Sequence, residues 1–222
     1  MADRNAEIRT LAEGAVALGL HVEASVIDRV LRLLAELERW SRAYNLTAID
    51  SRAEMLTHHV LDSWSIAKFL HGTRIIDVGT GAGFPGLPLA IIAPDKEFTL
   101  LDSNGKKVRF VAHAARTLGL QNVVAVHARV EEHIPAAPFD TILTRAFAPM
   151  PELLRKVAGL CDQGTHVLAM KGRRSETARE GLPAGWRVET DRPLSIPGLV
   201  EERHLLVLRR APDGSAALDS SP

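Results

Sequence analysis

The first 72 residues place their hydrophobic positions at helical spacing. One hydrophobic face begins after Ser25, which we interpret as an N-cap, and consists of Val26, Val30, Leu34, Leu37 and Tyr44. A second face follows Ser51 and Glu54, which have capping-box spacing, and consists of Leu56, Val60, Trp64, Ala67 and Leu70. We predict helices here that either cover one face of a following sheet or grip a substrate.

From residue 74 the pattern changes to short β-branched and apolar runs that alternate with helical stretches. The predicted strands are "RIIDVG" (74–79), "EFTLLDS" (97–103), "NVVAVHARV" (122–130), "FDTILTRA" (139–146) and "GTHVLAMKG" (164–172). This alternation predicts an α/β fold with a mostly parallel, doubly wound sheet. Residues 186–210 offer two further strands without a helix between them, so these should pair antiparallel at the sheet edge.

The chain of 222 residues is long enough for one α/β domain with a small appendage. We therefore expect an N-terminal helical extension over residues 1–72 and a catalytic or binding domain over 73–210. The last stretch, 211–222, is small and polar and ends in proline, and we expect it to be disordered.

Composition narrows the class of protein. Lys plus Arg equal Asp plus Glu, 27 against 27, so net charge favours neither a nucleic acid nor a membrane surface. The one cysteine, Cys161, excludes a disulfide framework and a CxxC metal site within this chain, which fits the cytoplasm. No apolar run has the length of a signal peptide core or a membrane span, so we expect a cytoplasmic protein without membrane partners.

The stretch "IIDVGTGAGFPG" (75–86) contains two overlapping glycine patterns. Gly79, Gly81 and Gly83 form GxGxG, whereas Gly81, Gly83 and Gly86 form the GxGxxG of a dinucleotide-binding turn. Glycines at this position let the chain turn with positive φ and let a ligand lie on the main chain. Prolines on both sides of Gly86 leave few N–H groups to hold a pyrophosphate, which weakens the second frame without excluding it.

Two carboxylates frame this turn. Asp102 ends the second predicted strand, where it can accept both ribose hydroxyls of an adenosine, a moiety that NAD and S-adenosylmethionine share. Asp77 precedes Gly79 by two positions, where it can organise the loop, approach the amino group of a methionine moiety and repel a pyrophosphate. The residues therefore favour a protein that binds S-adenosylmethionine. The alternatives are an NAD-dependent oxidoreductase and a non-catalytic nucleotide sensor. Thr80 lies in the same loop and joins the cofactor-binding candidates.

With these residues in place, the chain resembles a known family, the bacterial 16S rRNA guanine-N7 methyltransferases, also called the glucose-inhibited division protein B family. The matching stretches are "YNLTAI" (44–49), "HHVLDSWSI" (58–66), "IIDVGTGAGFPGLPLAI" (75–91), "LLDSNGKKVRF" (100–110), "ARVEE" (128–132), "TRAFA" (144–148), "MKG" (170–172) and "ERHLLVL" (202–208). They follow in order over nearly the whole chain.

The resemblance implies a Rossmann-like class I S-adenosylmethionine-dependent methyltransferase with an N-terminal helical extension. Its substrate would be one guanine of 16S ribosomal RNA near the decoding region, presented as RNA or in a small-subunit particle, and we expect a monomer without a metal. The family's cofactor contacts correspond here to Gly79, Phe84, Val130, Glu131 and Arg145. Asp102 and Ser103 match the ribose-binding position of similar methyltransferases.

Arginine favours the O6/N7 edge of guanine, but N7 must stay open if it is to be methylated. We therefore assign Arg145 or Arg129, each near the end of a predicted strand, to O6 or an adjacent phosphate. The alternative is a surface ion pair with Glu131 or Glu132. Guanine N7 needs no general base, and Cys161 has no Pro-Cys context of the kind that carbon-5 methylators use.

Other polar groups give weaker signals. His58, His59 and Asp62 are close in sequence, but neighbouring imidazoles on a helix point apart, so we prefer a structural hydrogen bond or a wall of the cleft to a metal site. Two basic clusters are candidate phosphate contacts or solvated faces: Lys106 with Lys107, and Lys171 with Arg173 and Arg174.

Overall fold

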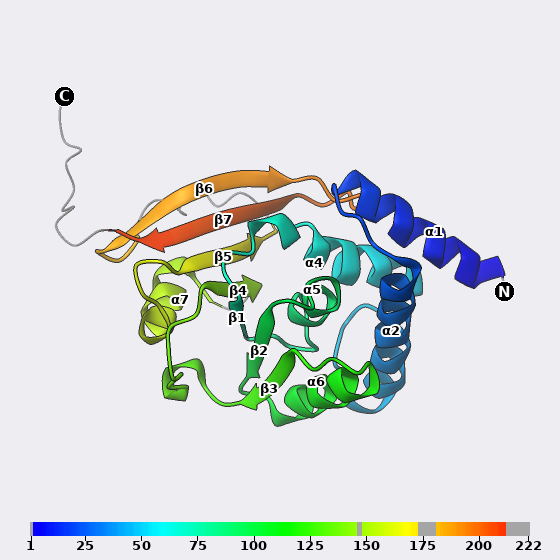
Figure 1. The fold of residues 1–222 in the computed structure, drawn as a ribbon, viewed down its shortest axis with the longest axis horizontal. Coiled ribbons are helices and arrows are strands. Elements are labelled where there is room, and N and C mark those ends of the chain that lie inside the picture. Colours follow the sequence, from blue (N-terminus) through cyan, green and yellow to red (C-terminus); the bar gives the residue numbers. More distant parts are fainter. Residues whose placement is uncertain (1, 146–147, 173–180, 212–222) are drawn as a thin grey trace.

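The computed structural model describes residues 2–145, 148–172 and 181–211, which form a seven-stranded sheet with helices on both faces (Figure 1). The strands are β1 (Arg74–Val78), β2 (Glu97–Asp102), β3 (Val123–His127), β4 (Thr141–Arg145), β5 (His166–Lys171), β6 (Trp186–Leu194) and β7 (Arg203–Arg210). Their order is β3-β2-β1-β4-β5-β7-β6. The expected tail and two basic candidates, Arg173 and Arg174, lie outside the described residues.

Helices fill the connections before and between the strands. The α-helices are α1 (Ala2–Ala17), α2 (Ala24–Tyr44), α3 (Arg52–Glu54), α4 (Asp62–Trp64), α5 (Gly86–Ile92), α6 (Gly105–Thr117) and α7 (Met150–Val157). A π-helix, η1 (Met55–Leu61), joins α3 to α4, and three short 3₁₀ turns are η2 (Ala67–Phe69), η3 (Val130–Glu132) and η4 (Ala158–Leu160).

The sheet confirms the predicted fold class. Strands β1 to β5 pair in parallel, and the chain order reverses between β1 and β4, where β1 has β2 on one side and β4 on the other. The two C-terminal strands pair antiparallel at the sheet edge, as expected. Strand β7 lies between β5 and β6 and runs antiparallel to both, so that β6 forms the outer edge of the sheet.

Two hydrophobic layers hold the helices on the sheet. One layer joins α1, α2, the segment 55–66, α5 and α6 to sheet residues such as Ile75 and Leu100. The other joins α7 to the opposite face through residues such as Ile76 and Leu154. The N-terminal helices belong to the first layer, where α1 packs on η1 and α2 packs on α5 and α6 (Figure 1). They therefore cover this face of the sheet as an outer layer over α5 and α6. The division of the chain near residue 72 stays a prediction.

Side-chain caps mark the starts of α3 and α6. The Ser51 hydroxyl accepts a hydrogen bond from the Glu54 N–H at 3.4 Å, and Asn104 caps α6 by accepting from two N–H groups. The prediction of Ser25 as an N-cap is wrong, because α2 begins at Ala24 and the Ser25 hydroxyl donates to the Glu23 carboxylate.

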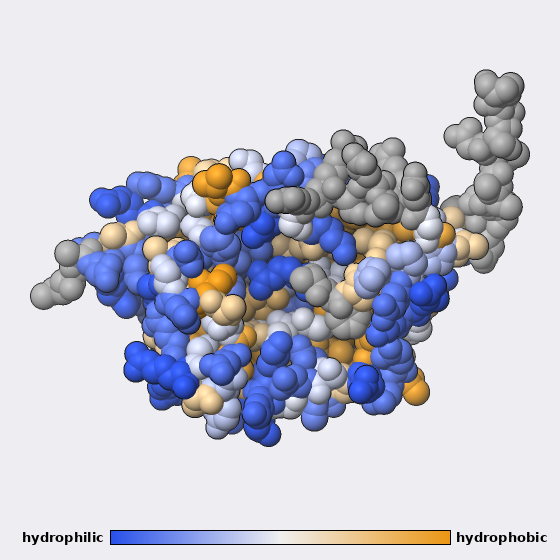
Figure 2. Space-filling view, turned by 180° about the vertical axis from the view of Figure 1, so that it is seen from behind, coloured by the Kyte–Doolittle hydropathy of each residue, from blue (hydrophilic) through white to orange (hydrophobic). Residues whose placement is uncertain are grey.

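The face of the molecule in Figure 2 is mostly hydrophilic, and its hydrophobic side chains lie in small separate spots among the coloured residues. Such isolated apolar groups are usual on protein surfaces. None of the helices in the described residues combines the length and the apolar character that a membrane span needs.

Candidate functional site

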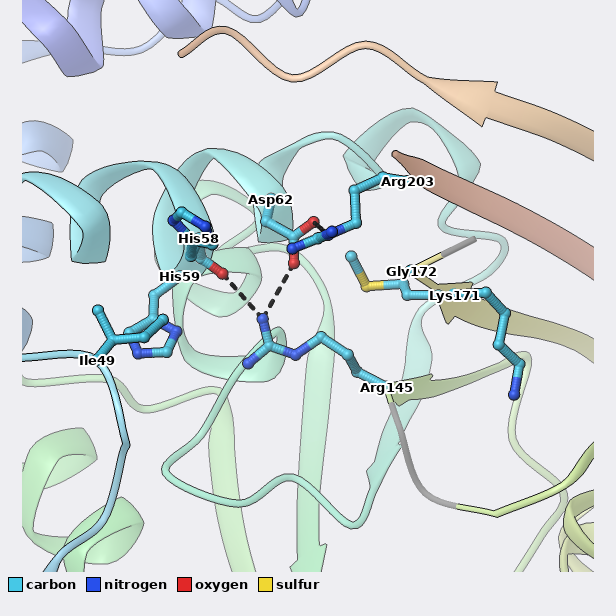
Figure 3. Close-up of a pocket in the computed structure, with 9 residues that line it drawn as sticks. Ile49, His58, His59, Asp62, Arg145, Lys171, Gly172 and Arg203 are labelled. Carbon is cyan, nitrogen blue, oxygen red and sulfur yellow. Dashed lines mark hydrogen bonds and ion pairs between the residues drawn. The ribbon is translucent and has the colours of Figure 1, made fainter. Parts of the chain in front are cut away.

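Two cavities open at the edge of the sheet where the parallel strands end. The smaller, of about 200 Å³, lies beyond β2 and β3 and is lined by Gly79, Leu101, Asp102, Ser103, Ala128, Arg129, Val130, Glu131 and Lys156. The larger, of about 480 Å³, lies beyond β4 and β5 and is lined by Ile49, His58, His59, Asp62, Arg145, Met170, Lys171, Gly172 and Arg203 (Figure 3). Ligands of open α/β sheets bind at this edge, near the point where the strand order reverses.

The glycine turn after β1 lies between these cavities. Gly79, Gly81 and Gly83 have φ of 69°, 62° and 87°, a region that favours glycine. The N–H groups of Gly79 and Thr80 both donate to the Leu101 carbonyl, at 2.9 and 3.0 Å, which fixes the turn to the end of β2. A Cβ added at Gly81 would meet no atom within 4 Å, so the main chain is open to a ligand there.

Asp77 lies beneath the turn and organises it. Its Oδ2 accepts from the Thr80 hydroxyl at 2.7 Å and from the Gly86 N–H at 2.9 Å. Its Oδ1 is buried and has no hydrogen-bond partner among the described residues. Burial raises the pKa of Asp77 from 3.8 to about 6, against the opposing effect of the Thr80 hydrogen bond. The side chain is 1% exposed and remains mostly ionised at pH 7.

Asp102 holds the turn from the other side. Its Oδ2 accepts from the Gly81 N–H and its Oδ1 from the Asn104 N–H, both at 2.8 Å. It is 8% exposed and lines the smaller cavity, next to Ser103. The carboxylate that we expected to bind a ribose therefore also orders the loop, and its oxygens retain lone pairs that face the cavity lining.

The candidates after β3 also line the smaller cavity. Val130 is buried, whereas Arg129 and Glu131 are exposed. Glu131 pairs with Lys156 of α7 at 3.3 Å. The structure thus brings Val130 and Glu131, which the resemblance implies as cofactor contacts, to the same cavity as Asp102. Arg129, which we assigned to O6 or a phosphate, lines this cavity too.

Arg145, the other arginine candidate, lies in the larger cavity. Its Nη1 donates to Asp62 Oδ2 and to the His58 carbonyl, each at 3.0 Å (Figure 3). Asp62 is 1% exposed, and its Oδ1 lies 3.3 Å from Arg203 Nε. The expected alternative, an ion pair of Arg145 with Glu131 or Glu132, is wrong, because Asp62 is its acidic partner.

His59 connects the larger cavity to the glycine turn. Its ring stacks on Phe84 with centroids 4.5 Å apart, and its Nε2 lies 3.0 Å from the Thr47 hydroxyl. Burial, together with the charge of Arg145, lowers the pKa of His59 to about 3, so the imidazole is neutral at physiological pH. The histidine pair and Asp62 thus form a wall of the cavity, one of the two roles that we preferred.

Several lining residues were not predicted as site residues. Ile49 and Arg203 reach the larger cavity from distant parts of the chain, and Lys171 was considered only as a phosphate contact. Burial lowers the pKa of Lys171, whose Nζ lies 3.5 Å from the Ala148 carbonyl. The one signal for Ile49 and Arg203 was their position in "YNLTAI" and "ERHLLVL", two of the stretches that carry the family resemblance.

The residues at the turn fit S-adenosylmethionine. The open main chain at Gly81 and the buried, unpartnered Oδ1 of Asp77 provide contacts for a ligand with a positive end. The dinucleotide frame fits less well, because the Gly86 N–H is bound to Asp77 and the following helix α5 has 7 residues. Within the described ranges, no three acidic, histidine or cysteine side chains are grouped as metal ligands would be.

Comparisons with known proteins agree with this geometry. The family model described as "rRNA small subunit methyltransferase G" matches residues 27–207. A curated protein named ribosomal RNA small subunit methyltransferase G from Methylococcus capsulatus (strain Bath) is 48% identical over 199 residues, covering 90% of this chain and 97% of its own. One of the same name from Pseudomonas putida (strain F1) is 45% identical over 202 residues, covering 90% and 94%.

A solved structure shares the fold. The crystal structure of a SAM dependent methyltransferase from Aquifex aeolicus superposes with a TM-score of 0.55 and 16% sequence identity, over 77% of this chain and 98% of that one.

Proposed function

This chain belongs to the rRNA small subunit methyltransferase G family, and from that premise we propose that it transfers the methyl group of S-adenosylmethionine to N7 of a guanine in 16S ribosomal RNA, near the decoding region. The observation that supports this most directly is the glycine turn between two cavities. Gly79 lines the smaller cavity, and Phe84 of the same turn stacks on His59 in the wall of the larger.

We assign the smaller cavity to the cofactor and the larger to the target base. Asp102 and Ser103 would hold the ribose, Val130 and Glu131 the adenosine end, and the main chain from Gly79 to Phe84 the methionine end. Asp77 keeps Thr80 in place and presents a negative charge beneath the turn. When bound, S-adenosylmethionine supplies an electrophilic methyl group on a sulfonium.

The chain's own residues position the base and do not need to remove a proton. Guanine N7 holds an in-plane lone pair and is unprotonated near neutral pH, so its attack on a methyl group needs no general base. Alignment of the reacting atoms can contribute about 7–11 kcal/mol to such a reaction. A cysteine nucleophile is not available, because burial raises the pKa of the Cys161 thiol to about 12.

Arginines face both halves of this site. Arg145 in the larger cavity is the group we assign to O6 of the target guanine or to an adjacent phosphate. Arg129 in the smaller cavity, next to Asp102, is better placed for a phosphate or for the cofactor than for the base. His59 stays neutral, so its ring adds no positive charge close to a sulfonium.

The NAD-dependent oxidoreductase is not supported. The matched family and the relatives are methyltransferases, and the Gly86 N–H is bound to Asp77 instead of being free for a diphosphate. We place the enzyme in the cytoplasm, where its ribosomal substrate is found, and we expect it to act as a monomer on RNA or on a small-subunit particle. Lys106, Lys107 and Lys171 remain candidate phosphate contacts.

Methyl transfer to purified rRNA and to small-subunit particles tests this function. Particles from a strain that lacks the homologous methyltransferase are incubated with tritiated S-adenosylmethionine, and the RNA is digested to nucleosides. We expect the label in 7-methylguanosine from 16S RNA. Label in another nucleoside, or the absence of label with both substrates, would reject the proposal.

A further inference from the structure

We propose that Asp62 is a positioning residue, which fixes the orientation in which Arg145 meets the target guanine. The inference rests on the proposed function and deepens it. It assigns a role to a buried carboxylate that lines the larger cavity but does not belong to the glycine turn.

Asp62 and the neighbouring main chain use all the donors of one arginine nitrogen. A guanidinium Nη carries two N–H groups. Those of Arg145 Nη1 go to Asp62 Oδ2 and to the His58 carbonyl, both at 3.0 Å. Nε and Nη2 make no hydrogen bond to any described residue, so these are the donors left for RNA. Figure 3 shows the guanidinium beneath the helix, with one nitrogen directed at both acceptors.

This arrangement changes what the arginine can do to a guanine. A free arginine tends to contact O6 and N7 together through its two terminal nitrogens, which would cover the atom to be methylated. With Nη1 held by Asp62 and His58, Arg145 cannot turn that end-on fork toward the base. The edge formed by Nε and Nη2 stays available for O6 or a phosphate, and Asp62 and the His58 carbonyl set its orientation.

The π-helix η1 brings the two acceptors to the same side. The Asp62 N–H donates to the carbonyls of Thr57 and His59, whereas in a regular α-helix it would donate to that of His58. The His58 carbonyl accepts from Arg145. Single π-turns within helices are frequent at functional sites, and this one sets the angle between the His58 carbonyl and the Asp62 side chain.

Asp62 itself is too deeply buried to act on the substrate. Its side chain is 1% exposed, its Oδ2 accepts from Arg145, and its Oδ1 makes an ion-pair contact of 3.3 Å with Arg203 Nε without a hydrogen bond to a described residue. A carboxylate between two arginines orients them, and it has little surface with which to contact RNA. It therefore acts through Arg145.

The test compares Asp62→Asn with Asp140→Asn in steady-state methyl transfer. Asparagine keeps the shape of the side chain but removes the charge that holds Arg145. We expect kcat to fall by roughly 10- to 100-fold, as a small misalignment can cause. We expect KM for the RNA to stay about the same, because Arg145 is still present to bind the RNA and only its orientation is released. The control residue Asp140 accepts from the N–H groups of Thr73 and Arg74 before β4, at the opposite edge of the sheet, and its variant should keep both constants.

A double-mutant cycle with Arg145→Lys shows whether Asp62 acts through the arginine. Lysine cannot bond to both acceptors and still offer a planar donor, so in the Arg145→Lys background Asp62→Asn should lower kcat by about threefold at most. An equal loss in both backgrounds, or a rise of KM without loss of kcat, would overturn the inference. If Asp62→Asn does not fold, Asp62→Glu replaces it, with the same drop of kcat at preserved KM expected from its longer stem.

The wild-type product separates the two proposals. If the wild type forms 7-methylguanosine and Asp62→Asn keeps the wild-type kcat, the role of Asp62 is wrong and the proposed function stands. If the wild type forms no 7-methylguanosine, both proposals fail.

Discussion

Replacing Asp77 by asparagine removes a charge that the fold buries at a cost. Asparagine has nearly the same shape and keeps an oxygen that can accept from Thr80 and Gly86, as Asp77 Oδ2 does. The variant should therefore preserve the turn. What it changes is the response of stability to pH, because asparagine does not titrate.

The magnitude follows from the pKa of Asp77, which burial raises from 3.8 to about 6. A carboxyl with a raised pKa in the folded state stabilises the fold fully below pH 3.8, and this contribution is lost as the pH rises through 6. At pH 8 the ionised group costs about 3 kcal/mol of the free energy of unfolding, and at pH 5 about half as much. The difference between Asp77→Asn and the wild type should thus be about 1.4 kcal/mol more favourable to the variant at pH 8 than at pH 5.

Urea unfolding of both proteins at pH 5 and pH 8 measures this difference. The new amide N–H₂ is buried where Asp77 Oδ1 has no partner among the described residues, and it costs about 1–3 kcal/mol. That cost is the same at both pH values and cancels in the comparison.

Asp140→Asn is the control for the pH comparison. Hydrogen bonds from the N–H groups of Arg74 and Thr73 outweigh the opposing effect of partial burial and lower the pKa of Asp140. The difference in unfolding free energy between Asp140→Asn and the wild type should therefore not change between pH 5 and pH 8. If the difference in unfolding free energy between Asp77→Asn and the wild type is also the same at pH 5 and pH 8, the reasoning about a buried, ionised Asp77 is wrong.

Four further predictions concern the site. Gly81 and Gly119 have φ of 62° and 67°, and a new Cβ would meet no atom within 4 Å at either position. Replacing either glycine by alanine should therefore lower the free energy of unfolding by about 1–2 kcal/mol. Calorimetry should show a loss of S-adenosylmethionine affinity for Gly81→Ala but not for Gly119→Ala. Asp102→Ala should weaken that affinity roughly 10- to 100-fold in the same calorimetry, because a charge-assisted contact to the ribose is lost. Arg145→Ala should lower single-turnover transfer by roughly 100-fold, and an unchanged rate with unchanged cofactor affinity would refute its role. Raising the salt from roughly 50 to 200 mM should weaken RNA binding steeply in a filter assay, whereas a flat response would exclude phosphate contacts as its main source.

The sequence predicted those parts of the fold that local patterns determine. The buried runs of β1, β2, β4 and β5 match the predicted strands, because strands covered on both faces are mostly apolar. Strand β3, also predicted, lies at the sheet edge and is partly exposed. In α6, Val108, Val111 and Ala115 recur at helical spacing and are buried. The N-cap of α2 was assigned wrongly because Ser25 and Glu23 both carry an accepting side chain, and Ser25 bonds to Glu23 instead of to the main chain.

The candidate site was predictable where it lies on one short stretch. Asp77 and the glycines of the turn are neighbours in sequence, and Asp102 could be placed because parallel strands end at a common edge. The contacts of Arg145 could not be predicted in this way. Asp62 begins α4 directly after the π-helix η1, Arg203 begins the antiparallel strand β7, and only the packing of these elements brings them together.

A crystal structure with S-adenosylhomocysteine bound tests the central assignment most directly. We expect its main chain contacts on the turn from Gly79 to Phe84, its ribose at Asp102, and its sulfur directed toward the cavity that contains Arg145. A ligand bound elsewhere, or one with its ribose away from Asp102 and its sulfur directed away from Arg145, would contradict the assignment of the two cavities.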